Sequence, residues 1–566
     1  MRRTILIAAA VGALWCGSAG AGTALFPGVS YTRQVQFTLH GPIVFHVLTA
    51  PRPVGLYALK PVLSNDLITG RETVTSMQRR LLPQTNVVGV NGDFFHWTLG
   101  FPSGVLIRSG VLDHQPIAGR SSIGVDAAGT LDVRRVAFFG SWRGSAAGHP
   151  FQSVNQPPGA GQTVLFTSAW GAETPVEPGT VEVTLEPFPA TAPNVPLTGP
   201  VVAVSSGGGT QIPADGAVLV ARGKDAPLLA GEASVGSSLT LRLILRPSWT
   251  GVVDALGGGP VLVRQGLPVF RALEEFTPSQ VIGRDPRTAV GQRADGSLVI
   301  IAVDGRRTGY SVGITNFDLG QMLVRLGAVT GSALDSGGST TIAFNGRLLN
   351  RPSDPTGERP VSEMLALTYA GVYAPETPAV LSPNGDGVGE TEPLSYKVVR
   401  PSTVDAQLLG PDGVARQLDA APRTPGTYTF SWDGLSPDGS PALEGTWRWI
   451  VTAVDDQGRQ SSMMRVFALN RTLGFVTVRT GGTPRLRTSF TLTRPAFVTV
   501  RIVGTGGSVL KTLARRAFVA GVAAVTWDGV RADRRRARPG DYTVRISASN
   551  EVGRVELVRP FVLRAR

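Results

Sequence analysis

The stretch Leu334-Asp335-Ser336-Gly337-Gly338-Ser339-Thr340-Thr341 decides how the first two thirds of this chain are interpreted. It is small and polar, and it lies between the apolar segments 326–329 and 342–344. Its glycines permit positive φ and a close ligand approach, while its hydroxyl and N–H groups can hold an anion. The same residue types also form ordinary turns. By itself, the stretch leaves both a surface turn and a ligand site open.

Three apolar runs in this half of the chain end in polar turns. Residues 298–303 end at Asp304-Gly305, another apolar strand leads into Asp335, and the run 87–90 ends in Asn91-Gly92-Asp93. Open sheets tend to build ligand sites at the ends of their strands. These neighbours therefore favour a binding or catalytic site over an isolated surface turn.

Periodicity predicts an α+β fold for residues 22–373, β-rich and mixed, with a few helices. Short apolar or alternating segments separated by glycine and proline are typical of strands and turns. Residues 72–82 have helical spacing, and Thr315-Asn316-Phe317-Asp318 is a capping box that opens a second helix. From residue 100 to 260 the pattern predicts only strands and turns.

After residue 373 the chain repeats itself. Trp432-Asp433-Gly434 recurs as Trp527-Asp528-Gly529, and three further landmarks recur at the same spacing. Each copy has about 95 residues of short strands, which is the size of an immunoglobulin-like sandwich. We therefore expect two tandem immunoglobulin-like β-sandwich domains, at 374–470 and 471–566.

The N-terminus has the pattern of an export signal. Met1-Arg2-Arg3 precedes the apolar run 5–15 and the small residues Ala19-Gly20-Ala21, which predicts a signal peptide over residues 1–21 and a secreted or envelope-associated protein. No later stretch reaches about 18 apolar residues, so no transmembrane anchor is expected. The one cysteine, Cys16, lies within the signal, so we expect no disulfide and no cysteine chemistry in the mature chain.

The net charge of +13 narrows the possible partners only partly. A basic chain can bind nucleic acid, but scattered arginines on an exported chain without an aromatic-basic module favour an anionic wall polymer or a phosphorylated glycan. A coding bias toward arginine is the alternative. Nucleic acid is not expected as a partner, and the oligomeric state is open.

Several motif blocks follow one another along the first two thirds of the chain. They are Val90-Asn91-Gly92-Asp93-Phe94-Phe95, Ile212-Pro213-Ala214-Asp215-Gly216, Gly257-Gly258-Gly259-Pro260, Arg287-Thr288-Ala289-Val290-Gly291, Val303-Asp304-Gly305-Arg306, residues 334–340, and Asn350-Arg351-Pro352-Ser353-Asp354 with Arg359-Pro360-Val361. On these blocks, residues 22–373 resemble the phosphodiester glycosidase family, which includes the uncovering enzyme that removes N-acetylglucosamine from a phosphodiester. This chain has Asp93 and Ser336 where the family pattern has glycine, and Asp93 adds a carboxylate that can change substrate choice.

The tail is similar to the immunoglobulin-like domains named after the flagellar hook cap protein, because it repeats the Trp-Asp-Gly motif.

The resemblance implies an exported hydrolase that cleaves the glycosidic bond of a sugar-1-phosphodiester, with an N-acetylglucosamine-like sugar, in envelope or extracellular glycan. Because the leaving phosphate ester is a weak base, one carboxylate and cationic groups can suffice where most glycosidases use two carboxylates. The candidate catalytic carboxylates are Asp304 and Asp335. The candidate substrate-binding residues are Asn91, Asp93, His96, Arg287, Arg306, Gly337, Gly338, Ser339, Thr340, Glu358 and Arg359.

Structural interpretations stay open beside these roles. The aspartates can accept backbone N–H groups in turns, the arginines can form surface salt bridges, and His96 can be a structural histidine. Glu358 and Arg359 either close the pocket or pair with each other. The alternative functions are a non-catalytic glycan- or wall-binding surface protein and a structural protein built from the sandwiches. The residues leave the sugar, the aglycone and the retaining or inverting course open.

The turn that begins the tail has a further possible role. Ser382-Pro383-Asn384-Gly385-Asp386-Gly387 with Glu390 is similar to a calcium-binding turn but lacks the alternating aspartates of an EF-hand loop. Either Ca²⁺ is held by Asn384, Asp386 and Glu390, or the segment is a plain inter-domain turn. No other cofactor is expected.

Overall fold

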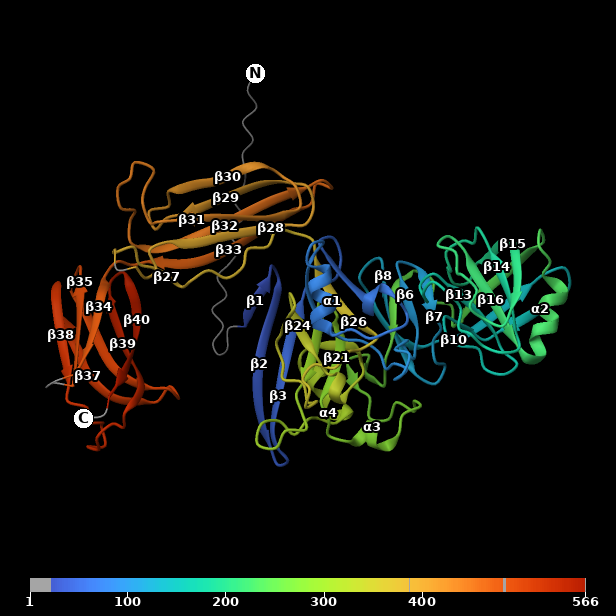
Figure 1. Ribbon diagram of the computed structural model, residues 1–566, viewed down its shortest axis with the longest axis horizontal. Helices are drawn as coiled ribbons and strands as arrows, with labels where there is room; N and C mark the ends of the chain where they lie inside the picture. Colours follow the sequence, from blue (N-terminus) through green and yellow to red (C-terminus); the bar gives the residue numbers. More distant parts are fainter. Residues whose placement is uncertain (1–21, 386, 482–484, 565–566) are drawn as a thin grey trace, which may run out of the picture. The chain divides into compact units, whose positions relative to one another are not determined.

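The computed structural model describes residues 22–385, 387–481 and 485–564. Within these residues the protein consists of several β-sheets and a few short helices, which confirms the predicted β-rich class (Figure 1). The chain divides into two compact units, Met1–Tyr369 and Ala370–Arg566. The predicted signal peptide lies outside the described residues. No helix in the described ranges is long and apolar enough to cross a bilayer.

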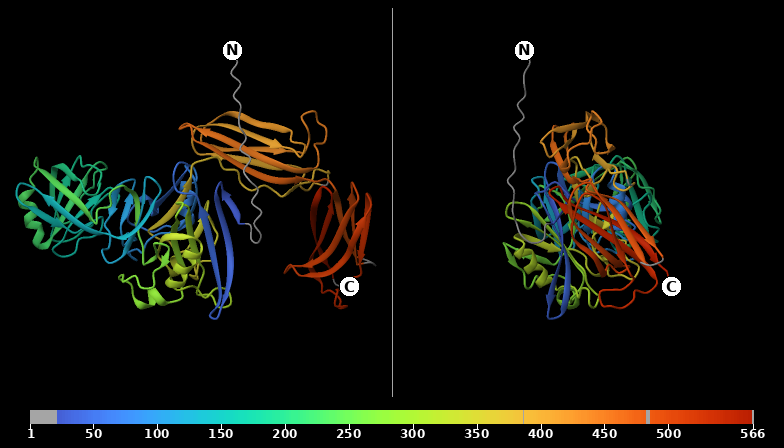
Figure 2. Two further views of the ribbon diagram at one scale, coloured as in Figure 1. Left: turned by 180° about the vertical axis from the view of Figure 1, so that it is seen from behind. Right: turned by 90° about the vertical axis from the view of Figure 1, so that its left-hand side faces the viewer.

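Two antiparallel sheets of the first unit carry the predicted site. The stretch 334–341 leaves the first sheet at β23 and enters the second at β24, so it connects the two. Strands β2 and β3 form a long hairpin at one edge of the first sheet (Figure 2). The first sheet consists, in spatial order, of β1 (Thr23–Phe26), β2 (Val29–Thr38), β3 (Gly41–Ala50), β22 (Leu298–Val303), β21 (Arg287–Arg293), β23 (Ala328–Ala333), β19 (Val261–Arg264) and β20 (Leu267–Pro268). The second consists of β25 (Arg347–Leu348), β24 (Ile342–Phe344), β5 (Asn86–Asn91), β26 (Glu363–Tyr369) and β4 (Tyr57–Leu63).

Both helices predicted from sequence are present. Helix α1 (Val74–Leu81) starts at Thr73, whose side chain accepts a hydrogen bond from Ser76 N, and it packs on β5, β24 and β26. Helix α4 (Asn316–Arg325) is capped in the same way by Thr315, and its buried face packs on β19, β20 and β23 (Figure 1). The remaining helical segments are α2 (Ala226–Glu232), α3 (Pro278–Ile282), η1 (Ser64–Asp66), η2 (Gly223–Asp225) and η3 (Gly337–Ser339).

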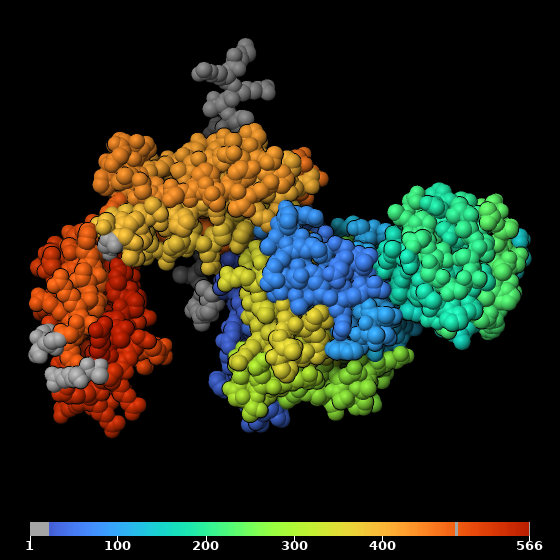
Figure 3. Space-filling view, viewed as in Figure 1, coloured from blue at the N-terminus to red at the C-terminus, as the bar shows by residue number. Residues whose placement is uncertain are grey.

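The region 100–260 forms two further sheets and encloses its own apolar core, which includes Trp142, Leu219 and Leu241. These residues are coloured cyan to green in Figure 3. The prediction of strands and turns alone was wrong at α2, because seven residues are too few to establish a helical period. One sheet consists of β7 (Val111–His114), β6 (Leu106–Arg108), β18 (Val252–Gly257), β8 (Ser121–Asp126) and β9 (Leu131–Arg135). The other consists of β11 (Gly148–Phe151), β10 (Ala137–Arg143), β17 (Ser238–Arg246), β15 (Pro196–Ser206), β14 (Thr180–Leu185), β16 (Ala217–Arg222), β13 (Thr163–Thr167) and β12 (Ser153–Val154).

The second unit contains the repeat as two pairs of sheets, each pair around one core. Trp432 and Trp449 lie in the core of the first copy, and Trp527 lies in that of the second. The strand order β30-β29-β32-β33 recurs as β37-β36-β39-β40. The first copy consists of β27 (Val380–Leu381), β33 (Gln460–Leu469), β32 (Gly445–Asp455), β29 (Ser402–Leu409) and β30 (Ala415–Arg423), with β28 (Glu392–Val398) paired to β31 (Gly426–Trp432). The second consists of β34 (Leu473–Thr480), β35 (Leu486–Leu492) and β38 (Gly521–Trp527), with β37 (Val509–Phe518), β36 (Ala496–Gly504), β39 (Gly540–Asn550) and β40 (Gly553–Leu563).

Candidate active site

The stretch 334–341 is held against the end of β5 by Asn91, which is fully buried. The Asn91 amide donates to the Asp335 carbonyl at 2.9 Å, and its Oδ1 accepts from Thr341 N at 3.1 Å and from Thr288 Oγ1 at 2.6 Å. Asp335 N in turn donates to the Gly92 carbonyl. Asn91 therefore fixes the loop by bonds to its backbone and leaves the Asp335 carboxylate to other partners.

Three buried carboxylates meet beside this loop: Asp93 after β5, Asp335 after β23, and Glu363 at the start of β26. Glu363 Oε1 accepts from Asp93 N at 2.6 Å, and Asp93 Oδ2 accepts from Gly104 N at 2.6 Å. Asp335 Oδ1 accepts from its neighbour Ser336 N at 2.7 Å. Each side chain comes from a different strand end, so the cluster exists only in the folded chain.

The cluster holds its protons more tightly than isolated carboxyls do. Burial raises the pKa of Asp93 to about 7, and the negative charge of Asp335 adds to the rise. Burial likewise raises the pKa of Asp335 to about 6, although the Ser339 hydroxyl, Ser336 N–H and two arginines oppose it. Burial and the charges of Asp93 and Asp335 raise the pKa of Glu363 well above its ordinary value. Close to neutral pH, the site thus contains both protonated and ionised carboxyl groups.

Arg120 and Arg359 supply positive charge to this cluster. Both lower the pKa of Asp335 through space. Arg359 forms a two-pronged ion pair with Asp354, at 2.8 and 3.0 Å, and its Nη1 donates to Ser339 Oγ at 3.4 Å. A side chain at Gly338 would collide with this ion pair, so glycine is required there for close approach.

Arg287 and Arg306 also lie near the loop. The buried guanidinium of Arg287 donates to the Gly283 carbonyl and feels the charges of Asp285, Arg306 and Asp335, and burial lowers its pKa. Arg306 pairs with Asp285 at 2.8 Å, and its guanidinium lies against Gly337. The structure therefore brings Asp335, Arg287, Arg306 and Arg359 around the stretch 334–341.

Asp304 lies in a different environment. Its buried carboxylate accepts from Tyr310 Oη at 2.8 Å, Arg351 N at 3.1 Å and Asn350 Nδ2 at 3.2 Å, and lies 3.1 Å from His46 Nε2. Burial opposes its ionisation, but these partners outweigh burial, and the pKa of Asp304 is held below its ordinary value. Asn350 also donates to the Thr340 carbonyl, so it links Asp304 to the loop.

Two predicted residues have structural partners of their own. His96 is exposed, stacks on Phe101 and accepts a hydrogen bond from Leu99 N, as a turn histidine does. Glu358 accepts from Thr75 N at 2.9 Å and Thr75 Oγ1 at 2.6 Å in the first turn of α1. It therefore caps this helix, and Arg359 pairs with Asp354 instead.

Glu363 and Arg120 belong to the cluster but were not among the candidates named from sequence. Glu363 carries a usable signal, because it is an acidic residue directly before the apolar run 364–367. Arg120 lies between glycine and serine in a turn, and nothing in its neighbourhood separates it from the other arginines.

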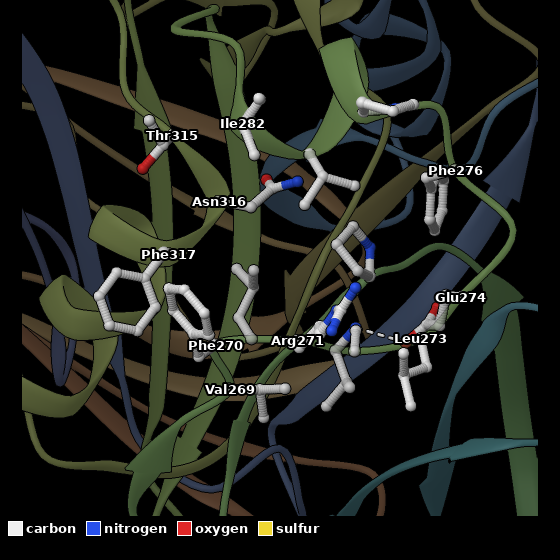
Figure 4. Close-up of a pocket in the computed structure, with 16 residues that line it drawn as sticks. Val269, Phe270, Arg271, Leu273, Glu274, Phe276, Ile282, Thr315, Asn316 and Phe317 are labelled. Atoms are coloured by element: carbon white, nitrogen blue, oxygen red, sulfur yellow. Dashed lines mark hydrogen bonds between the residues drawn. The ribbon is translucent and has the colours of Figure 1, made fainter.

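One crevice touches the cluster, and a larger cavity lies near it. The narrow crevice is lined by Asp93, Arg120 and Gly257 among others. The larger cavity, of about 590 Å³, is lined by Phe270 and Phe317, which meet edge to face at 5.2 Å (Figure 4). Glu274 and Phe276 line this cavity, and the Arg120 guanidinium lies 4.6 Å from the Phe276 ring centre. The larger cavity thus adjoins the carboxylates through Arg120 and does not contain them.

The predicted calcium turn is described only in part. Asp386 lies outside the described residues. The Glu390 carboxylate accepts from Gly385 N and Gly387 N at 3.0 and 2.9 Å, which closes the turn. Among the described residues no three His, Cys, Asp or Glu side chains gather as a metal site requires. Calcium binding by Asn384, Asp386 and Glu390 stays a prediction.

Carboxyl groups with raised pKa values beside guanidinium groups are the chemical equipment of a glycosidase site that accepts an anion. Comparison of the sequence with models of known protein families points to the same class of site. Residues 194–368 match the phosphodiester glycosidase family model, and residues 476–551 match the FlgD Ig-like domain model. Both predicted resemblances are thereby confirmed over the matched residues: a phosphodiester glycosidase domain at 194–368 and a FlgD Ig-like domain at 476–551.

Individual relatives match shorter stretches. Over 119 residues the chain is 37% identical to the SPbeta prophage-derived uncharacterized protein YomE of Bacillus subtilis strain 168, covering 21% of this chain and 18% of that protein. Over 68 residues it is 40% identical to the N-acetylglucosamine-1-phosphodiester alpha-N-acetylglucosaminidase of Bos taurus, covering 12% of each. The chain thus spans less than a fifth of the length of these curated relatives. The crystal structure of a hypothetical protein from Synechocystis shares the fold, with a TM-score of 0.53 and 22% identity over 62% of this chain and 64% of that one.

Proposed function

We propose that this protein is an exported hydrolase that cleaves the glycosidic bond of a sugar-1-phosphodiester in envelope or extracellular glycan. The observation that carries the proposal is the buried cluster of Asp93, Asp335 and Glu363 next to Arg120 and Arg359. The phosphodiester glycosidase domain supports the reaction class. The bovine relative's name supports N-acetylglucosamine or a similar sugar.

In the proposed reaction the bond between the sugar's anomeric carbon and the phosphate oxygen breaks, and water supplies the new hydroxyl. The ionised form of Asp335 stabilises or traps the positively charged anomeric carbon. Asp93, whose pKa is about 7, holds a proton for the departing phosphate oxygen, which needs it less than an alkoxide does. Glu363 orients Asp93 by accepting its backbone N–H.

The phosphate would be held by cations and by the loop. Arg359 is aligned by Asp354, Arg306 by Asp285, and both lie against the glycines at 337–338. Ser339 and Thr340 provide hydroxyl groups in the same place, and Thr340 Oγ1 is buried with no hydrogen-bond partner among the described residues. Guanidinium groups bind phosphate oxygens in pairs, which suits a diester.

The other predicted residues receive supporting roles in this proposal. Asn91 positions the loop, Arg287 adds positive charge behind it, and Asp304 anchors the segments at 304–311 and 350–351. A catalytic role for Asp304 stays a prediction. We also propose that residues 374–470 form an immunoglobulin-like domain like their successor, because the strand order is repeated.

The test is turnover of an N-acetylglucosamine-1-phosphodiester by purified residues 22–566, with Asp335→Asn and Asp93→Asn beside the parent. Asp113→Asn is the matched control, because Asp113 is an equally buried carboxylate that pairs with Arg108 outside the cluster. Turnover that is lost in the Asp335 variant and kept in the control supports the proposal. Binding of the diester without hydrolysis by the parent would favour a glycan-binding protein instead.

A further inference from the structure

The two copies of the repeat carry the same loop with opposite charge. In the second copy the loop 531–538 joins β38 to β39, which are labelled in Figure 1, and it reads Arg-Ala-Asp-Arg-Arg-Arg-Ala-Arg. The equivalent loop of the first copy, 436–443, reads Ser-Pro-Asp-Gly-Ser-Pro-Ala-Leu. We call residues 531–538 the arginine loop. It has five basic residues and one acidic residue, whereas its counterpart has one acidic residue and no basic one.

The backbone of the two loops is held by the same bonds. Asp533 Oδ1 accepts from Arg535 N at 3.1 Å, as Asp438 Oδ1 accepts from Ser440 N at 3.0 Å. The indole of the preceding tryptophan donates to the carbonyl three residues later in both copies, at 2.8 and 3.0 Å. Ala537 and Ala442 are the buried anchors. The fold of this loop therefore does not require arginine, since the first copy forms it without any.

One arginine stands where the backbone favours glycine. Arg534 has φ +64°, and its counterpart is Gly439 with φ +80°. A left-handed backbone is unfavourable for a residue with a Cβ and free for glycine. Arginine at 534 thus carries a conformational cost that the first copy avoids, which indicates that the charge at this position serves something other than folding.

The guanidinium groups of the arginine loop are free to meet a ligand. All five arginines are exposed, and within the described part of the chain only Arg531 has a carboxylate within ion-pair distance, Asp533 at 3.7 Å. Ala532 N donates to the Leu510 carbonyl, which places the loop beside β37 with Lys511. In the first copy, Arg423 of the matching strand β30 is already paired with Asp419.

We propose that the arginine loop is a docking site for a polyanionic glycan whose repeating units carry phosphodiesters. Closely spaced guanidinium groups suit closely spaced phosphates. The loop has no aromatic residue, so it lacks the stacking platform on which single-stranded nucleic acids rely. The choice of phosphate over other anions rests on the proposed function, but binding is measurable without turnover, so either idea can fail alone.

The test measures binding of poly(glycerol phosphate) to residues 22–566 by calorimetry at low and at physiological salt. The loop-swap variant carries Arg531→Ser, Arg534→Gly, Arg535→Ser, Arg536→Pro and Arg538→Leu, the residues of the first copy. We expect affinity to fall about a hundredfold at low salt, because each arginine near an anionic surface contributes severalfold. The melting temperature should hold or rise, since replacing Arg534 by glycine relieves the left-handed strain.

The matched control removes five other exposed arginines from the first unit, Arg143, Arg242, Arg246, Arg264 and Arg325, each to serine. The control loses as much positive charge as the loop-swap variant but keeps the arginine loop. Its affinity should therefore stay within about threefold of the parent. Equal losses in both variants, or unchanged binding after the loop swap, would overturn the proposal. Tighter binding of a single-stranded DNA of equal charge than of the glycerol phosphate polymer would overturn the assignment to a glycan.

Discussion

Asp304 and Asp335 follow two strands of one sheet, β22 and β23, yet the pKa values of their carboxyl groups shift in opposite directions. Asp304 comes directly after β22 and faces donors from His46, Tyr310 and the segment 350–351. Asp335 comes just after β23 and faces two other buried carboxyl groups. The pKa of the first is lowered and that of the second is raised. A strand-end position alone therefore does not assign a role to an aspartate; its surroundings do.

The opposite pKa shifts indicate that Asp304 contributes to stability and Asp335 to reactivity. A carboxylate satisfied by several donors stabilises the fold as long as it is ionised. A carboxylate buried away from water, as Asp335 is, is costly to ionise, and such costs collect at functional sites. The comparison predicts that variants at the two positions fail in different assays.

The largest effect is expected for Asp335→Asn. We expect kcat on a sugar-1-phosphodiester to fall by at least about a thousandfold, which is roughly 4 kcal/mol of transition-state stabilisation. The melting temperature should be unchanged or higher, because a buried charge is removed. Steady-state kinetics and calorimetry on the same preparation check this. A variant that keeps most of its turnover would show that Asp335 only shapes the loop.

The second effect concerns stability and belongs to Asp304→Asn. The amide nitrogen would face donors that now point at a carboxylate oxygen, so we expect a loss of about 3 kcal/mol in the free energy of unfolding. Urea unfolding at pH 7 measures it. If this variant instead keeps its stability and loses only kcat, Asp304 is catalytic and the contrast with Asp335 disappears.

Sequence reasoning identified the polar residues at the strand ends but not the side chains that surround them in the folded chain. The run 298–303 and the turn 334–341 are local patterns, so both were predictable, as was the Thr315 cap of α4. Which donors surround Asp304 depends on His46, about 260 residues away in the sequence, and no local pattern encodes that contact. Glu363 was missed although it directly precedes an apolar run, because its significance comes from its contact with Asp93, which follows another strand.

The third prediction uses pH. Folded Asp93 has a pKa of about 7, against an ordinary value near 3.8. Between about pH 4 and pH 7 the folded chain therefore keeps a proton that the unfolded chain has released, and stability falls as pH rises through this window. Asp93→Asn cannot titrate, so at pH 8 it should exceed the parent by about 4 kcal/mol in the free energy of unfolding. At pH 4 the two should agree.

Urea midpoints at pH 4, 6 and 8 measure this difference. The exposed Asp215→Asn is the control and should follow the parent at every pH. Parallel curves for Asp93→Asn and the parent would mean that Asp93 is ionised in the folded chain and lacks a proton to donate.

The smallest effect distinguishes two adjacent residues, Glu358 and Arg359. Glu358 caps α1 through Thr75, so Glu358→Gln should cost about 1 kcal/mol of stability and leave KM for the phosphodiester unchanged. Arg359→Lys keeps the charge but loses the two-pronged geometry, so KM should rise by about tenfold with little change in stability. A rise in KM for Glu358→Gln would place the start of α1 in the substrate site. Glu358 would then contribute to substrate binding and not only to the stability of the fold.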